Sequence, residues 1–90
     1  MKQAGAALNT YLPHSIRLPF GYCVTVKAVA PRTLKRVAQA DVMGCWDVGT
    51  RTIYIDKTMD EKGQRYVLTH EMMHAFADWQ HHALDGGVDA

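Results

Sequence analysis

Three stretches of the chain have residue patterns that are typical of β-strands. Tyr22–Val29 (YCVTVKAV) is rich in β-branched and aromatic residues whose side chains would alternate between two faces. Residues 42–46 and 52–56 flank a turn that contains Gly49, which predicts a β-hairpin. Side chains of the second arm would alternate, with Ile53 and Ile55 on one face and Thr52, Tyr54 and Asp56 on the other.

The C-terminal third has a helical period in place of alternation. Its apolar residues recur at spacings of three and four, which predicts a helix from about residue 60 to residue 84. Thr58 or Asp60 would cap the start of this helix, and Gly86-Gly87 would end it. The predicted buried stripe consists of Leu68, Met72, Ala75, Phe76, Trp79 and Ala83.

Two further segments have weaker helical patterns. Residues 2–12 would form a short helix, which Gly5 weakens, and residues 32–40 would form a short helix or an irregular link. Together the segments predict a single α+β domain spanning residues 1–90. In it, a short, three-stranded and largely antiparallel sheet would pack against the long C-terminal helix.

The predicted C-terminal helix contains His70-Glu71-Met72-Met73-His74, a match to H-E-x-x-H. Residues four apart lie on one face of a helix, about 6 Å apart along its axis. Two imidazoles at this spacing can converge on one metal ion, typically zinc, and Glu71 would lie beside that ion. There it could accept a proton from a metal-activated water as a general base. The histidine face, opposite the buried stripe, would also carry Val67, Ala77, Asp78 and His81.

Residues 70–79 (HEMMHAFADW) resemble the active-site helix of the zincin metallopeptidases. The H-E-x-x-H-A-x-x-D-aromatic run is similar to that of thermolysin-like enzymes. A strand at residues 52–56 before this helix also resembles the small ImmA-type and SprT-type zincins of phages and bacteria. The resemblance implies a small zincin-like domain with zinc as cofactor. It also implies a metalloendopeptidase that hydrolyses peptide bonds in a protein or peptide substrate.

The small size of the chain leaves an alternative open, because little protein remains to build a substrate cleft. In this alternative the domain binds zinc without catalysis and acts as a partner-binding or regulatory module. Glu71 favours the enzyme, because a purely structural zinc site has four protein ligands and needs no base.

A zinc site of this kind needs a third protein ligand, and its identity is open. Thermolysin-like zincins use a downstream glutamate, but no glutamate follows Glu71, and the histidine position of metzincins holds Gln80. The ligand would come through a break in the helix, a tail that folds back after Gly86, or another chain. We expect the break, since SprT-type zincins also use a downstream histidine. The candidates are His81 and His82, then Asp85, and more distantly Asp89.

Other residues could assist the site. Asp78, one turn beyond His74, would orient that imidazole by accepting its free N–H, or would be a solvated surface acid. Tyr66 and the downstream histidines could stabilise an oxyanion. In the zincins that this chain resembles, a sheet-edge strand ahead of the helix pairs with the substrate. The resemblance therefore predicts that Thr52–Asp56 binds substrate.

Composition narrows the class of protein. An apolar fraction of 48% and a charged fraction of 21% are ordinary for a globular domain, and the net charge of +1 gives no electrostatic case for nucleic-acid or membrane partners. No apolar run could span a bilayer, and the N-terminus lacks a secretory apolar centre, so we expect a cytoplasmic location. Cys23 and Cys45 are expected to be reduced core thiols, with a disulfide open only if their strands are neighbours.

Overall fold

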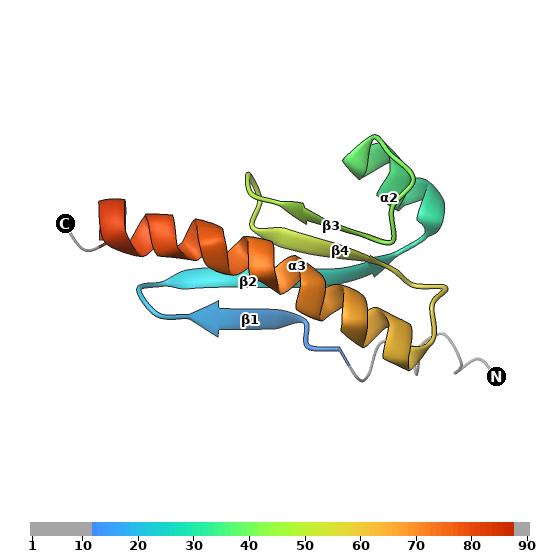
Figure 1. The fold of residues 1–90 in the computed structure, drawn as a ribbon, viewed down its shortest axis with the longest axis horizontal. Helices are drawn as coiled ribbons and strands as arrows, with labels where there is room; N and C mark the ends of the chain where they lie inside the picture. The colour runs from blue at the N-terminus through green and yellow to red at the C-terminus, as the bar shows by residue number, and fades with distance from the viewer. Residues whose placement is uncertain (1–11, 88–90) are drawn as a thin grey trace.

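The computed structural model describes residues 12–87 of the chain. The helix expected over residues 2–12 lies outside this range, apart from Leu12. The described residues form an α+β fold with a four-stranded mixed sheet and a long C-terminal helix (Figure 1). In chain order the elements are β1 (Ser15–Leu18), β2 (Tyr22–Val29), α2 (Pro31–Ala38), β3 (Gly44–Asp47), β4 (Thr52–Asp56), α3 (Glu61–His81) and the π-helical turn η1 (His82–Gly87).

The strands lie side by side in the order β1-β2-β4-β3 (Figure 1). The two outer strands pair antiparallel with their inner neighbours, whereas β2 and β4 run parallel, from Thr25 opposite Thr52 to Val29 opposite Asp56. A parallel pair needs a crossover connection, which here contains α2 and β3. Strand β2 and the β3–β4 hairpin are therefore confirmed. The expectation of only three strands is wrong, because β1 adds a fourth.

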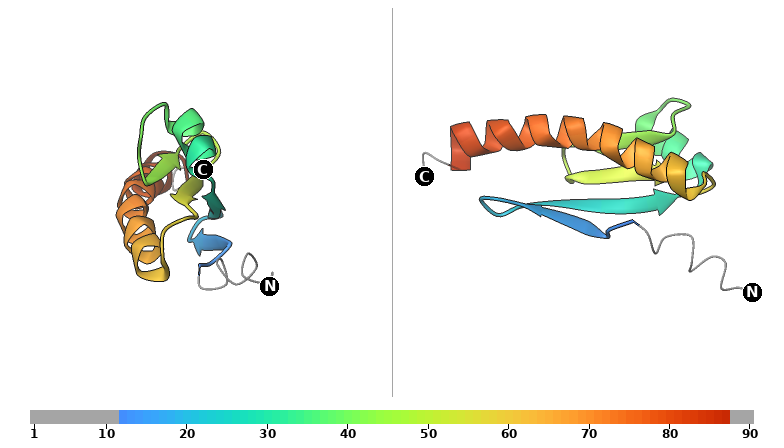
Figure 2. Two further views of the ribbon diagram at one scale, coloured as in Figure 1. Left: turned by 90° about the vertical axis from the view of Figure 1, so that its right-hand side faces the viewer. Right: turned by 60° about the horizontal axis from the view of Figure 1, so that its bottom comes forward.

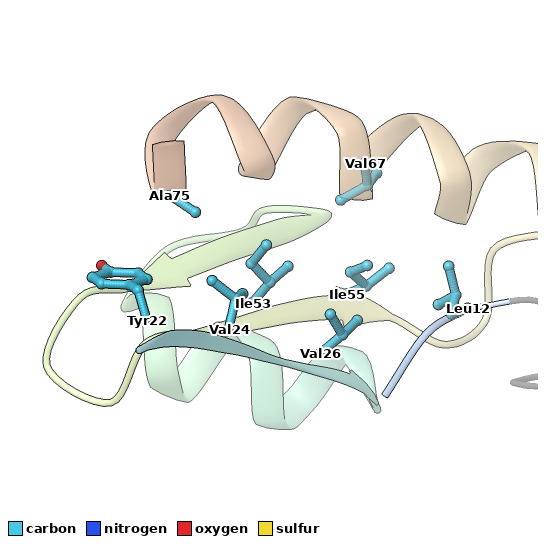
Figure 3. Packing of buried hydrophobic residues seen from close by; sticks show 8 residues of the cluster. All are labelled: Leu12, Tyr22, Val24, Val26, Ile53, Ile55, Val67 and Ala75. Atoms are coloured by element: carbon cyan, nitrogen blue, oxygen red, sulfur yellow. The ribbon is translucent and has the colours of Figure 1, made fainter. Parts of the chain in front are cut away.

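One face of the sheet packs against α3 (Figure 2). Figure 3 shows alternate side chains of β2 and β4 pointing toward this helix. Ile53 and Ile55 have no exposed surface, as the alternation in β4 predicts. Removing these apolar side chains from water is the main force that holds the helix on the sheet. The buried cluster consists of Leu12, Tyr22, Val24, Val26, Ile53, Ile55, Val67 and Ala75.

The short helix α2 covers part of the other face of the sheet, against β3 and β4 (Figure 3). Pro31 occupies its first turn, where the N–H that proline lacks would have no helical partner. Leu34 is completely buried and anchors the helix. The segment that the sequence leaves between helix and irregular link is therefore a helix.

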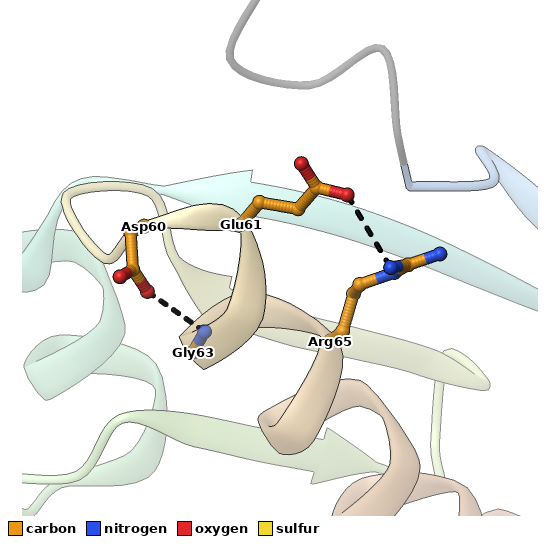
Figure 4. Close-up of polar contacts among 4 residues, drawn as sticks. All are labelled: Asp60, Glu61, Gly63 and Arg65. Atoms are coloured by element: carbon orange, nitrogen blue, oxygen red, sulfur yellow. Dashed lines mark hydrogen bonds and ion pairs between the residues drawn. The ribbon is translucent and has the colours of Figure 1, made fainter.

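Local polar contacts define the start of α3 (Figure 4). The Asp60 carboxylate accepts a hydrogen bond of 2.8 Å from the Gly63 N–H, which confirms Asp60 as the cap. In the same part of the helix, Glu61 and Arg65 form an exposed ion pair, with Oε2 of Glu61 3.3 Å from Nη1 of Arg65. No helix within residues 12–87 combines the length and the apolar character that crossing a bilayer requires.

α3 turns mainly the predicted face to the sheet, since Ala83 is buried and Leu68, Met72 and Trp79 pack against the core. Ala75 is buried as expected, but Phe76 is 45% exposed. Val67 and Glu71 are buried, although the period places Val67 with the histidines on the opposite face. The cause is the edge strand β3, because its Gly44 lies directly against Val67 and Glu71. The expected buried stripe is therefore correct except at Phe76, and the buried face extends further, to Val67 and Glu71.

The turn between β1 and β2 contacts the far part of α3. The Trp79 indole N–H donates a hydrogen bond of 2.9 Å to the Pro19 carbonyl, and the Phe20 ring stacks on Trp79 with centroids 6.4 Å apart. Phe20 (φ 69°) and Gly21 (φ 73°) both adopt the left-handed conformation of a tight hairpin turn, which is unfavourable for phenylalanine. These contacts tie the C-terminal half of α3 to the sheet.

Both cysteines are free thiols. They belong to β2 and β3, which are not neighbours in the sheet, so the condition for a disulfide is not met. Cys23 is exposed, and the expectation of a core thiol is wrong for this residue. Cys23 belongs to the set of β2 side chains that alternates with the core set. Cys45 is half-buried.

Candidate metal and active site

An open pocket of about 380 Å³ lies between α3 and the chain that leads into β3. Its walls are largely apolar, and two residues of the H-E-x-x-H motif, His70 and Glu71, contribute to them. Tyr66, one turn earlier on α3, is 71% exposed at the pocket, so its hydroxyl is accessible to a ligand there. The lining residues are Val42, Met43, Gly44, Tyr66, Val67, His70 and Glu71.

His70 and His74 are both exposed on consecutive turns of α3. Their ring centroids are 5.7 Å apart, and the rings are inclined at 76° to each other. At this separation, rotation about the side-chain torsions can bring one nitrogen of each ring to a shared ion. The two imidazoles therefore fit a metal as a pair of ligands.

Glu71 lies on the sheet side of α3 and is only 9% exposed. Its Oε2 is 3.4 Å from the position that a Cβ on Gly44 would occupy, so the carboxyl group sits against the backbone of β3. The charge of Glu71 also affects its surroundings. Burial raises the pKa of the Cys45 thiol, and the nearby carboxylates of Glu71 and Asp47 raise it further. The carboxyl group of Glu71 therefore lies at the inner wall of the pocket.

Asp78 interacts with the sheet through Trp46. The Trp46 indole N–H donates a hydrogen bond to the Asp78 carboxylate, which links β3 to α3. Burial raises the pKa of the Tyr22 phenol, Arg51 opposes this shift, and the charge of Asp78 adds to it. The sequence predicts that Asp78 orients His74. In the structure its carboxylate instead accepts a hydrogen bond from Trp46 and lies near Tyr22.

We expect Trp46→Phe to destabilise the fold by about 1–3 kcal/mol, because Asp78 would lose its donor in a partly buried position. Asp78→Asn keeps an acceptor for the indole and should cost less. Chemical unfolding followed by circular dichroism measures both changes. If Trp46→Phe unfolds at the same denaturant concentration as the parent, the hydrogen bond contributes nothing to holding β3 on α3.

The expected break in the helix before His81 does not occur. α3 runs through His81, and His82 keeps helical backbone angles as the chain enters η1. His81 is exposed, and its Nδ1 atom lies 3.8 Å from Oδ2 of Asp85. The His82 ring lies against the Tyr22 ring, with ring centroids 5.3 Å apart. A continuous helix carries these side chains away from His70 and His74 by its rise of 1.5 Å per residue.

No group of three His, Cys, Asp or Glu side chains within residues 12–87 is arranged to hold a metal ion. The assignment of the third ligand to His81, His82 or Asp85 therefore gains no support. Asp89 lies outside the described residues. A fold-back of the tail and a ligand from another chain remain as the two other expected routes.

The expectation that Thr52–Asp56 is an edge strand that binds substrate is wrong. This stretch is β4, an inner strand whose backbone pairs with β2 on one side and β3 on the other. Its hydrogen-bonding groups are therefore not free to pair with a peptide. The edge next to the pocket is β3, which pairs only with β4 in the described sheet.

Sequence reasoning missed the part of the site that β3 supplies. A glycine within the apolar run VMGCW is a signal of a bulge or of a close backbone approach, and Gly44 makes such an approach to Glu71. Trp46 could not be identified as the partner of Asp78, because the contact joins residues 32 positions apart.

Comparisons with known proteins give no relative for this chain. No protein-family description, no curated protein and no solved structure matches it.

Proposed function

We propose that this chain is a zinc-dependent metallopeptidase of the zincin type. The observation that carries the proposal is the arrangement of the H-E-x-x-H motif at an open pocket. His70 and His74 are exposed ligands with centroids 5.7 Å apart, while Glu71 is buried beside them against Gly44. One histidine of the ligand pair, His70, therefore shares the pocket with the base, and His74 lies one helical turn further along α3.

Each residue has a distinct part in the proposed chemistry. His70 and His74 would hold zinc, which activates water at neutral pH and polarises a carbonyl group. Glu71 would accept the proton of the attacking water and return it to the leaving amine. Because Glu71 points toward β3 and the histidines point to solvent, the base stays separate from the ligand pair.

The substrate would be an extended peptide that lies along the edge of β3 that has no partner strand among residues 12–87. This edge borders the pocket through Gly44, and a peptide that pairs with it would run past Glu71 and His70. Main-chain pairing gives affinity with little sequence preference. The apolar side chains of Val42 and Met43 would contact one substrate side chain at the pocket.

Zinc content and peptide cleavage test the proposal together. We expect about one zinc ion per chain in the purified protein, which is the load of a single site. Removal of zinc by a chelator should abolish cleavage of a peptide library detected by mass spectrometry, and added zinc should restore it. His70→Ala and His74→Ala should lose both zinc and cleavage.

His81→Ala is the matched control, because it removes an exposed histidine from the same helix outside the motif. It should keep the zinc content and activity of the parent. Full zinc occupancy in His70→Ala and His74→Ala would refute the metal site. Zinc binding without any cleavage would refute the peptidase and support the non-catalytic partner-binding module instead.

A further inference from the structure

Charged residues are segregated along this chain in a way that the net charge of +1 conceals. Residues 1–40 contain six Lys or Arg residues and no Asp or Glu, whereas residues 41–90 contain four Lys or Arg residues and all nine acids. Such an asymmetry between two halves of a chain is typical of proteins that contact polyanions. Its meaning depends on where the fold puts the basic half.

The basic half forms β1, β2 and α2. On the strands, Arg17 and Lys27 are exposed, and they belong to the residue set that alternates with the core. Ile16 and Val26 pack in the core under α3, so Arg17 and Lys27 project from the opposite face. This is the face on which α2 packs, mainly against β3 and β4 (Figure 3).

The exposed side of α2 adds three cations to this face. Arg32, Lys35 and Arg36 are all exposed and are spaced i, i+3 and i+4, so they share one side of the helix. Within residues 12–87, Lys35 alone of these three forms an ion pair, with its Nζ atom 3.6 Å from Oδ1 of the exposed Asp41. We call Arg17, Lys27, Arg32, Lys35 and Arg36 the basic face.

Besides Asp41, two acids at the ends of the inner sheet region hydrogen-bond within turns. Asp56, which lies beside Val29, accepts hydrogen bonds from the N–H and the hydroxyl of Thr58. Asp47 similarly accepts from the backbone of Gly49 and the hydroxyl of Thr50. Neither carboxylate forms an ion pair with a cation of the basic face among the described residues, so Lys35–Asp41 is the one such pair there.

We propose that the basic face binds the phosphodiester backbone of a nucleic acid. The charge is complementary, and phosphate contacts need only cations and small polar groups. Among the described residues, the large exposed apolar side chains include none from β1 or β2 and only Val37 from α2. A membrane-binding surface would need an apolar face to insert among lipids.

The basic face lies across the sheet from the pocket at Glu71, so a nucleic acid there would leave the pocket open. The proposal does not rest on the proposed peptidase activity. Binding should depend steeply on salt, with log K falling against log salt at a slope of about −3.6 if four cations engage a duplex. Affinity would then fall by about 10²-fold between 50 and 200 mM salt.

The test measures fluorescence anisotropy of a labelled DNA duplex with the full chain, in the presence of a chelator so that zinc has no influence. Arg17→Gln/Lys27→Gln and Arg32→Gln/Arg36→Gln should each weaken binding at least tenfold and reduce the salt slope by about 2. Lys62→Gln/Arg65→Gln removes the same charge from α3, across the sheet from the basic face, and should change the affinity less than twofold. Circular dichroism checks that all variants are folded.

Two results would overturn the proposal: a salt slope near zero, or an equal loss of affinity in Lys62→Gln/Arg65→Gln. Competition identifies the occupant. If polyglutamate or vesicles that contain phosphatidylserine bind at least as tightly as DNA at equal charge concentration, the surface recognises acidic protein or lipid and not nucleic acid. If these competitors displace DNA only weakly, the result supports the proposal that the basic face binds nucleic acid.

Discussion

Glu71→Gln is expected to keep zinc at the parent level while lowering kcat/KM for peptide cleavage by about 10²–10⁴-fold, the usual contribution of a general base. Glutamine has nearly the same shape as glutamate, so it can occupy the buried position against Gly44. It cannot accept the proton that the reaction releases. A quenched fluorescent peptide measures the rate, and mass spectrometry of the intact protein measures the zinc.

The control for this substitution is Glu61→Gln, which neutralises an exposed carboxylate at the start of the same helix. It should leave kcat/KM unchanged. A second readout does not depend on activity. In a Cys23→Ser background, Glu71→Gln should lower the pKa of the Cys45 thiol, because a neighbouring carboxylate that disfavours the thiolate has been removed. Equal cleavage rates in Glu71→Gln and the parent would contradict the role of Glu71 as the base.

The elements that sequence could predict are those with strong local signals. β2 and β4 are apolar or alternating runs bounded by turns, and their predicted limits match the structure. The start of α3 follows from the capping preference of Asp60. These signals lie within a few residues of each other, so no tertiary information is needed to find them.

The order of the strands could not be predicted in this way. β1 has four residues, SIRL, of which only Ile16 and Leu18 pack toward the core, and it gives a weak signal. The parallel pairing of β2 and β4 joins residues 27 positions apart, as in Val26 opposite Ile53. Pairing over such a distance depends on the whole fold, and it decides whether a strand is inner or outer. The expectation that Thr52–Asp56 forms an edge failed for this reason.

The candidate site was predictable only in the part that one helix contains. Helical spacing is sufficient to group His70, Glu71 and His74, and the structure has them on adjacent turns of α3. The additional burial of Val67 and Glu71 depends on contact with β3, which the spacing of apolar residues in α3 cannot reveal. A buried Glu71 beside Gly44 is therefore a tertiary feature. The third ligand is also a tertiary question, and a continuous helix through His81 removed the expected answer.

Gly44→Ala is expected to destabilise the fold by about 1–3 kcal/mol, the usual cost of overpacking. An added Cβ would overlap Cγ1 of Val67 and would lie 3.3 Å from Cγ of Glu71. Because both neighbours belong to the buried side of α3, β3 would have to move away from the helix. The same shift would displace Glu71 within the pocket, so cleavage should fall along with the free energy of unfolding.

Two further variants separate the local contact from the general effect of removing a glycine. Gly49→Ala adds a Cβ that meets only ordinary van der Waals contact, 3.4 Å from Asp47, and should change stability by less than about 0.5 kcal/mol. Val67→Ala removes the overlapping methyl group and leaves a cavity. Combined with Gly44→Ala, it should cost less than the sum of the two single changes, with a coupling energy of about 0.5–3 kcal/mol. Strict additivity in this cycle, measured by chemical unfolding, would show that a Cβ at position 44 does not meet the Val67 side chain.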